Sequence, residues 1–419
     1  MLTQDPDADV REPAAATEQV LLGRQPIVDR DGRMYAFELL FRDRYIDAAS
    51  LSDDVVATSQ VLHHVFAELG VDKALGPYRG FVNCDERMLL MPEILDVLPP
   101  ERVVIEILES VPPTAEVLSR LRELKAAGFA LALDDYRGTR DHYEQLLPLV
   151  DFIKIDLPHI PADALASTVS SLRGLPALLV AEKVQARSQA QQCQAIGFDF
   201  FQGYFFARPV IVEGRKLGLP EQALLRLLGL LMQDSDTRVI VDEFKRQPGL
   251  SLNLLRIANS AAVGTAARVQ SIAQAIVIVG RRQLRRWVQL LLYTDSARGS
   301  LANPLLQLAA TRGHLMECLA DRLWPGSGER SESAFMVGIL SLMPAVFGMP
   351  MADILPTLPV ADDVRAALVG RAGPLGDLLA AIEALEVEPM NDARLPRGLT
   401  CEVFSQHLID AMSWASRIG

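Results

Sequence analysis

Residues 103–136, VVIEILESVPPTAEVLSRLRELKAAGFALALDDY, contain the repeating unit that decides the fold. The apolar run at 103–107 predicts a short strand, and the segment 114–128 has the spacing of an amphipathic helix. A second apolar run at 130–134 predicts the next strand. Because a strand followed by a helix and another strand forms a parallel pair, this stretch indicates a parallel sheet.

The same alternation extends through the first half of the chain. Helical patterns at 55–70, 88–98 and 186–197 separate other apolar runs, and Gly197 is a plausible helix C-cap. The predicted strands are 20–28, 35–40, 80–83, 103–107, 130–134, 152–155, 177–182 and 198–201. About eight runs in roughly 200 residues predict a closed, TIM-like β/α barrel, and the pattern leaves an open doubly wound sheet as the alternative.

Length and composition indicate more than one domain. The chain has 419 residues, 50% of them hydrophobic, which is long for a single core. Beyond about residue 213 strand-like runs nearly vanish and leucine-rich helical patterns take over. We therefore expect a disordered acidic tail at 1–19, an α/β barrel domain at 20–210 and an all-α domain at 211–419.

The net charge, the N-terminal residues and the cysteine content argue against several classes of protein. The 41 basic and 53 acidic residues give a net charge of −12, which argues against a long nucleic acid as partner. The N-terminal residues lack a basic start and an apolar run, and the uncharged stretch 334–351 is interrupted by Gly and Pro, which favours buried helix over a membrane span. Four widely separated cysteines suit a reducing compartment, so we expect a cytoplasmic protein.

Most of the predicted strands end in, or next to, a group able to bind a cation or move a proton. These groups are Glu38, Asn83, Glu106, Asp134, Asp135, Lys154, Asp156, Glu182 and Gln202. In a β/α barrel the carboxyl ends of the strands open onto one face, so the side chains would converge. Carboxylates gathered in this way repel one another unless cations bind between them, and their hard oxygen ligands suit Mg²⁺ or Mn²⁺.

These residues resemble the EAL domain of bacterial cyclic di-GMP phosphodiesterases. The signature strand reads Glu38-Leu39-Leu40-Phe41-Arg42, a variant of the family's Glu-Ala-Leu-x-Arg. The other blocks follow in the family's order: FVNC at 81–84, VVIEILES at 103–110, LALDDY at 131–136, FIKID at 152–156, AEKVQ at 181–185 and FFQGYFFARP at 200–209. The resemblance covers about residues 20 to 210.

The resemblance implies an enzyme that cuts one phosphodiester bond of cyclic di-GMP and releases linear pGpG. It also implies a two-metal site for Mg²⁺ or Mn²⁺, with Ca²⁺ as an inhibitory substitute. The first metal would be held by Glu38, Asn83, Glu106 and Asp134. Asp134 and Asp135 would share in the second.

The resemblance further assigns a catalytic set and a substrate-binding set. Lys154 would orient the attacking water or neutralise the phosphate, and Glu182 would be the general base. Glu109 matches the family's loop-stabilising carboxylate, and Gln202 would complete the pocket. The substrate-binding set, in which Arg42 meets a phosphate, comprises Gln25, Pro26, Arg42 and Gln202.

Two segments depart from the family pattern. The family's Phe and Gly-Thr-Gly loop is replaced by Tyr136-Arg137-Gly138-Thr139, and its Glu-Gly-Val-Glu by Glu182-Lys183-Val184-Gln185. Because the altered loop also helps to form the family's dimer, a homodimer stays possible but open. The same departures keep an alternative function open, in which the barrel is a weak or inactive sensor of cyclic di-GMP or a protein-interaction scaffold.

The second half resembles the HDOD domain, a helical relative of HD-type metal phosphohydrolases. The resemblance rests on the segments 247–250 (QPGL), 258–260 (ANS) and 271–276 (SIAQAI), together with Leu255. The segment 338–343, where a His-Asp pair would lie, reads GILSLM and contains neither residue. We therefore assign no catalysis to this half and expect it to regulate the barrel or bind a protein partner, as in bacterial EAL-HDOD signalling proteins.

Overall fold

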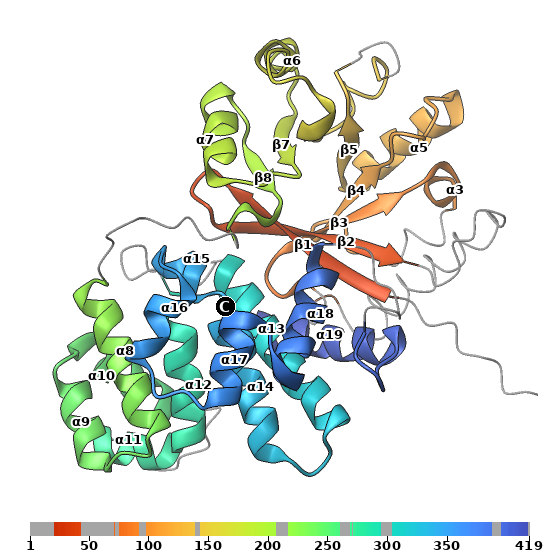
Figure 1. Cartoon of the computed structure of the whole chain (residues 1–419). Coiled ribbons are helices and arrows are strands. Elements are labelled where there is room, and N and C mark those ends of the chain that lie inside the picture. The colour runs from red at the N-terminus through yellow and green to blue at the C-terminus, as the bar shows by residue number, and fades with distance from the viewer. Residues whose placement is uncertain are drawn as a thin grey trace, which may run out of the picture.

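A β/α barrel precedes a helical domain in the computed structural model (Figure 1). The structure describes residues 21–42, 71, 75–91, 98–138, 143–206, 217–259, 269, 271–294, 304–387 and 395–417. The predicted acidic tail at 1–19, the helical pattern at 55–70 and most of the expected domain boundary, at 207–216, lie outside the described residues.

Eight strands close into one barrel in chain order. They are β1 (Leu21–Asp29), β2 (Met34–Arg42), β3 (Arg79–Cys84), β4 (Val103–Ile107), β5 (Ala130–Tyr136), β6 (Phe152–Asp156), β7 (Leu178–Glu182) and β8 (Phe200–Gln202). Each corresponds to a strand predicted from the sequence. The closed barrel is confirmed, and the open sheet is excluded.

The first strand runs against the predicted parallel direction. β1 pairs antiparallel with both β2 and β8, whereas the other neighbouring strands pair parallel. Residues 30–33 are too few for a crossover connection and form a hairpin instead. The Asp29 carboxylate holds this turn, because it accepts hydrogen bonds from the backbone N–H groups of Asp31 (2.9 Å) and Arg33 (2.8 Å).

Short helices connect the strands on the outside of the barrel. They are α3 (Glu86–Leu89), α5 (Ala115–Ala126), α6 (Leu165–Leu172) and α7 (Arg187–Ile196). The Thr114 hydroxyl caps α5 by accepting a hydrogen bond from Val117 N–H at 3.2 Å. The predicted cap of α7 is confirmed, since Gly197 has a left-handed φ of 115°. α3 ends earlier than the predicted helix 88–98, of which residues 92–97 are not described.

Two layers of side chains fill the barrel interior. The first layer is apolar and takes one residue from each strand: Ile27, Ala36, Phe81, Val104, Ala132, Phe152, Val180 and Phe200. Alternate residues of a strand point to the same side, so the residue two positions nearer the barrel mouth also points inward. That second layer is polar and comprises Gln25, Glu38, Asn83, Glu106, Asp134, Lys154, Glu182 and Gln202.

The described part of the chain after residue 217 is helical. Its helices are α8 (Leu219–Met232), α9 (Thr237–Lys245), α10 (Pro248–Ala258), α11 (Ile272–Val279), α12 (Arg281–Leu291), α13 (Pro304–Leu323), α14 (Gly328–Leu340), α15 (Met343–Phe347), α16 (Met351–Ile354), α17 (Asp362–Gly370), α18 (Gly373–Val387) and α19 (Cys401–Ser416). They bury a continuous apolar core of their own. The prediction of an all-α second half is confirmed.

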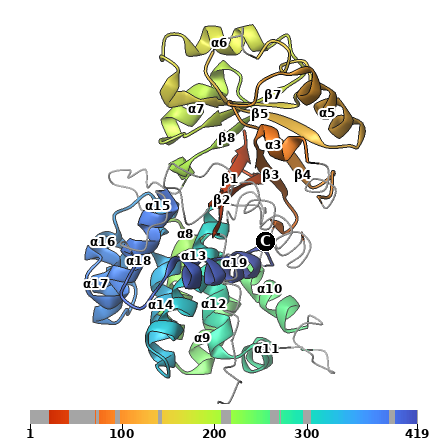
Figure 2. The same ribbon diagram turned by 90° about the vertical axis from the view of Figure 1, so that its right-hand side faces the viewer.

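The C-terminal helix α19 joins the two domains. In both views α13 and α19 lie beside β1 and β2 (Figures 1 and 2). The Arg24 guanidinium on β1 donates a hydrogen bond to the Met412 carbonyl of α19 at 3.1 Å, and Ile409 packs against the core of the barrel domain. The two domains therefore share an interface at the barrel mouth.

No single helix among the described residues is long and apolar enough to span a membrane. Gly328–Phe347 and Met351–Thr357 pass such a test only as a pair, across a bend of 102°. Side chains of this pair, including Phe335, Ile339 and Phe347, are buried among the other helices. The prediction that the uncharged stretch 334–351 forms buried helix is confirmed.

A close contact between α13 and α14 gives a stability prediction. A Cβ at Gly338 would lie 2.7 Å from both the Arg312 carbonyl oxygen and Gly313 Cα. Because these are backbone atoms, Gly338→Ala should lower the free energy of unfolding by about 1–3 kcal/mol, as overpacked sites do. Urea denaturation measures this. Gly249→Ala is the control, since a Cβ at Gly249 meets nothing within 4 Å; equal stability of the two variants would contradict the prediction.

Candidate functional site

The polar layer of the barrel is organised around the ammonium group of Lys154. Its Nζ lies 3.2 Å from Glu38 Oε2, 3.1 Å from Asp134 Oδ1 and 2.7 Å from Glu182 Oε1, and it also pairs with Glu106. The four strands β2, β4, β5 and β7 supply these carboxylates. A cation at the barrel axis therefore holds together four acidic groups that would otherwise repel one another.

Amide side chains orient the Glu38 carboxylate. Asn83 Nδ2 donates to Glu38 Oε1 at 2.9 Å. Gln202 Nε2 donates to Glu38 Oε2 and also to Gln25 Oε1, the latter at 2.9 Å. Residues from β1, β2, β3 and β8 thus form one hydrogen-bonded chain. This chain fixes the Glu38 carboxylate at the barrel axis.

Burial and charge shift the pKa values of this cluster in different directions. Burial raises the pKa of Glu182 to about 8, against the opposing effect of Lys154. Burial also raises the pKa of Glu106 well above its ordinary value. For Lys154 burial favours the neutral form, but the carboxylates, Glu106 first, outweigh it and raise its pKa. For Asp134 burial is likewise outweighed, and Lys154 holds the pKa below its usual value.

The cluster has oxygen ligands suited to a divalent metal ion. Carboxylate oxygens of Glu38, Glu106 and Glu182 lie within 4.8 Å of one another, and so do those of Asp134, Asp135 and Glu182. Several buried oxygens lack a hydrogen-bond partner: Asn83 Oδ1, Glu106 Oε2 and Glu182 Oε2. Unpaired buried oxygens are costly, and a hard cation would satisfy them. The residues present therefore fit a Mg²⁺-type or Mn²⁺-type ion.

A β-bulge lets two consecutive aspartates serve the same site. The register between β5 and β6 shifts between Leu133 and Tyr136, and Asp135 has a φ of 44°. Consecutive strand residues otherwise point to opposite faces, but here Asp134 and Asp135 both line the mouth of the barrel. The bulge thus supplies the second group of oxygen ligands.

Lys183 adds a second cation beside that group. It has a left-handed φ of 56°, a conformation unusual for a residue with a side chain. Its Nζ lies 2.5 Å from Asp156 Oδ2 and 3.6 Å from Asp135 Oδ1. Lys183, which stands where the family pattern has glycine, therefore partly neutralises the negative charge of Asp135 and Asp156.

The other altered position, Arg137, links two loops at the barrel rim. Its Nη2 lies 3.9 Å from Glu109 Oε1 and 3.5 Å from Asp135 Oδ2. Glu109, which is partly exposed, is thus linked to Asp135 through Arg137. This ion pair is partly exposed, so it contributes at most about 1 kcal/mol to stability.

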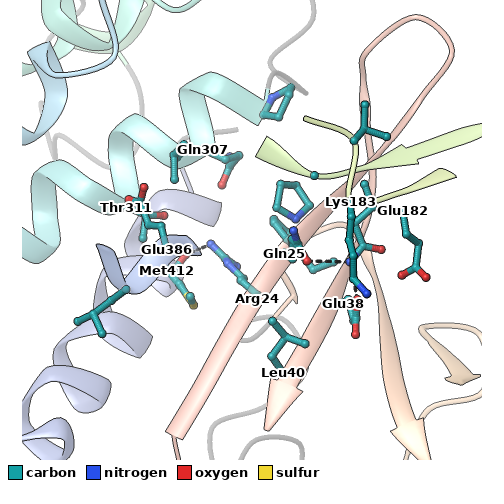
Figure 3. Close-up of a pocket in the computed structure, with 18 of the residues that line it drawn as sticks. Arg24, Gln25, Glu38, Leu40, Glu182, Lys183, Gln307, Thr311, Glu386 and Met412 are labelled. Atoms are coloured by element: carbon teal, nitrogen blue, oxygen red, sulfur yellow. Dashed lines mark hydrogen bonds between the residues drawn. The ribbon is translucent and has the colours of Figure 1, made fainter. Parts of the chain in front are cut away.

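A pocket of about 640 Å³ opens from this cluster toward the helical domain (Figure 3). Gln25, Pro26, Glu38 and Gln202 line it from the barrel. The facing wall comes from α13, α18 and α19, through residues that include Gln307, Glu386 and Met412. Pockets of this size hold small-molecule ligands.

The structure brings together most of the residues predicted for the site. One cluster contains Lys154, Glu182 and Gln202. It also contains the five predicted metal ligands, which are Glu38, Asn83, Glu106, Asp134 and Asp135. Gln25 and Pro26 line the same pocket. Arg42 ends β2, but its side chain lies outside the described residues, as does Thr139 of the altered loop.

Sequence reasoning missed the contributions of Arg24 and of the helical domain. Arg24 lines the pocket, and its guanidinium lies 4.3 Å above the centre of the Phe37 ring. In the sequence, the only local signal for Arg24 was its position next to Gln25, a predicted substrate-binding residue. The pocket residues of α13, α18 and α19 carry no motif, so their role depends on the packing of the two domains.

Fold and site together define a β/α barrel with an acidic centre whose carboxylates could hold a metal ion, joined to a helical domain. Residues 12–209 match the profile of the EAL domain, and residues 219–351 match that of the HDOD domain.

Relatives of known name match almost the whole chain. Cyclic di-GMP phosphodiesterase CdgJ of Vibrio cholerae is 30% identical over 407 residues, which cover 95% of this chain and 93% of that protein. The uncharacterized protein YuxH of Bacillus subtilis is 29% identical over 411 residues, covering 96% and 99%. The solved calcium and cyclic di-GMP complex of Klebsiella pneumoniae BlrP1 is 25% identical with a TM-score of 0.39, covering 46% of this chain and 56% of its own.

The chain therefore belongs to the family of two-domain proteins in which an EAL domain precedes an HDOD domain.

The role of Lys154 predicts a metal-dependent stability change. Lys154→Met leaves three buried carboxylates and the half-buried Asp134 without their counter-charge, so in the presence of EDTA the variant should lose about 3–5 kcal/mol of unfolding free energy. Added Mn²⁺ should recover more stability in the variant than in the parent protein. Chemical denaturation with and without metal measures both effects.

Lys125→Met is the matched control for this substitution. Lys125 forms a surface ion pair with Asp151 at 2.9 Å, so its loss should cost less than about 1 kcal/mol. A Lys154→Met protein as stable as this control would show that Lys154 does not neutralise the cluster.

The raised pKa of Glu182 predicts proton release on metal binding. With a pKa of about 8, Glu182 is mostly protonated at pH 7, whereas a metal binds the carboxylate form. Mn²⁺ binding should therefore release protons and become tighter as the pH rises from about 6 to 8. Calorimetry in two buffers of different ionisation enthalpy measures the release, and Glu182→Gln should reduce it. Unchanged release in that variant would refute the assignment.

Proposed function

We propose that the chain is a metal-dependent phosphodiesterase of bacterial second-messenger signalling, which hydrolyses cyclic di-GMP to linear pGpG. The observation that carries the proposal is the buried cluster of Glu38, Glu106, Asp134 and Glu182 around one cation position. The relationship to the Vibrio cholerae phosphodiesterase along both domains supports the same substrate.

The polar layer contains the ligands that such a reaction needs. Glu38, Asn83, Glu106 and Asp134 would hold a first Mg²⁺ or Mn²⁺, and Asp134 and Asp135 would share in a second, with Ca²⁺ as an inhibitory substitute. When bound, these ions supply Lewis acidity at the phosphate and lower the pKa of water. The unpaired oxygens of Asn83 and Glu106 support this assignment.

The chain's own side chains would handle protons and charge. Glu182, whose pKa is raised to about 8, is a stronger base than an ordinary carboxylate and is suited to accept a proton from the attacking water. Lys154 carries a positive charge within the same cluster and would balance the negative charge of the phosphate. Gln202 would keep Glu38 oriented, and Arg42 would meet a phosphate.

The assay that tests the proposal is hydrolysis of cyclic di-GMP by the purified full chain with Mn²⁺. We expect pGpG as the product, detected by ion-pair chromatography, and its loss in EDTA. Glu38→Ala should abolish the activity because it removes a ligand at the barrel axis. Glu116→Gln, on an exposed turn of α5, is the control and should stay active. A folded parent protein that forms no pGpG with any divalent metal would overturn the enzyme assignment.

The second candidate function is a sensor that binds cyclic di-GMP without turnover. It is favoured by Lys183, whose ammonium pairs with Asp135 and Asp156 where the family has glycine. Calorimetric binding of cyclic di-GMP without pGpG formation would support the sensor, and absence of both would leave a scaffold. Restored turnover in Lys183→Gly would assign the deficit to this lysine.

The helical domain and the cellular context complete the proposal. We propose that the HDOD domain regulates the barrel or binds a protein partner, in the cytoplasm, where reduced thiols such as those of Cys84 and Cys193 persist. A homodimer is a further possible assembly, and light scattering of the purified chain would measure it.

A further inference from the structure

The helical domain contributes a mainly apolar wall to the pocket beside the acidic cluster, and a few polar side chains interrupt that wall. Gln307 and Thr311 on α13 and Glu386 on α18 line this wall, opposite Gln25 and Glu38 of the barrel (Figure 3). The phosphodiesterase chemistry described above makes no use of these three side chains. Their hydrogen-bonding groups are therefore available to a ligand that extends out of the barrel.

Gln307 has an unused acceptor. The residue is 3% exposed, and its Nε2 donates to the Ala415 carbonyl at 3.3 Å. Its Oε1 is buried without a hydrogen-bond partner. A buried acceptor without a donor costs about 1–3 kcal/mol, and a ligand carrying an N–H group would remove that cost.

Glu386 is a rigid acceptor for two donors. Arg312 Nε and Nη2 bind its Oε1 and Oε2 at 2.9 Å and 2.5 Å. Arg312 is itself buried and is held by Ser341 Oγ at 2.6 Å and by Glu383 Oε1 at 3.2 Å. Arg312 occupies the edge of the carboxylate that binds two parallel donors, but each oxygen keeps a further lone pair, so each can accept one more hydrogen bond from another direction.

A guanine base matches this combination of groups. Its N1–H or N2–H₂ can donate to the remaining lone pair of a Glu386 oxygen, and its O6 accepts from an amide N–H or a hydroxyl. Adenine has an acceptor at N1, which would face the carboxylate and repel it. An acidic residue backed by arginine, with an amide and a hydroxyl nearby, therefore selects guanine over adenine.

We propose that Gln307, Thr311 and Glu386 of the helical domain form a subsite for one guanine base of the ligand. The proposal rests on cyclic di-GMP as the ligand of the barrel. The dinucleotide then bridges the two domains, with a phosphate at the acidic cluster and a base against α13 and α18. The affinity for the ligand consequently depends on the position of the helical domain relative to the barrel.

Calorimetry on the full chain with Ca²⁺ tests the subsite by measuring the Kd of cyclic di-GMP. Gln307→Leu and Thr311→Val should each raise the Kd by about 2–10-fold, the effect of one neutral hydrogen bond. Glu386→Gln should raise it by about 10–100-fold, because a charged acceptor is lost. Glu386→Gln should also lower the ratio of the Kd for cyclic di-AMP to the Kd for cyclic di-GMP.

Two controls separate recognition of the base from general damage. Gln289→Leu removes another buried amide of the helical domain whose Oε1 has no hydrogen-bond partner and which lies away from the pocket. Its Kd should equal that of the parent. Far-UV circular dichroism and the urea midpoint of the Gln307→Leu and Thr311→Val proteins, compared with those of the parent, separate loss of base recognition from loss of the fold.

The outcomes distinguish the subsite from the function on which it rests. If the parent binds cyclic di-GMP and the Gln307, Thr311 and Glu386 variants bind it equally well, the subsite is wrong and the proposed function stands. If the parent does not bind cyclic di-GMP at all, both are wrong. Kd changes limited to the three pocket variants, with an unaltered Gln289→Leu protein, would support the subsite.

Discussion

The pairing of Lys154 with four carboxylates is the interaction on which the rest of the site depends. Glu38, Glu106, Asp134 and Glu182 come from different strands, and without a cation at the axis their mutual repulsion would oppose closure of the barrel. Burial in this cluster raises the pKa of Glu182, whereas Lys154 holds the pKa of Asp134 below its usual value. Because four carboxylates surround one ammonium group, the centre keeps an excess of negative charge. That excess favours binding of a divalent cation and, with the cation bound, of a phosphate.

Strand periodicity places the chemistry directly above an apolar layer. Phe81, Phe152 and Phe200 fill the barrel below the site, and the residues two positions further along their strands are Asn83, Lys154 and Gln202. The aromatic rings contact one another, with 5.3 Å between the centres of Phe81 and Phe152. This packed floor limits the depth of the pocket and holds the polar layer in place.

The helical domain makes the barrel mouth a shared pocket. α19 reaches the barrel through Arg24 and Met412, and α13 and α18 present polar groups toward the acidic cluster. In this arrangement a shift of α19 would change the shape of the ligand pocket without altering any metal ligand. The helical domain therefore contributes to the shape of the pocket through its wall.

The sequence by itself predicted the closed barrel, with an open sheet as the alternative, and the residues that gather at its mouth, because alternating strands and helices leave few topologies and strand ends meet on one face. It could not show that β1 runs antiparallel, since that depends on the four residues of one turn. Nor could it place Glu386 and Gln307, which have no motif, opposite Glu38. Only tertiary packing decided this, because the contacts between domains join residues more than 200 positions apart, where local patterns carry no information.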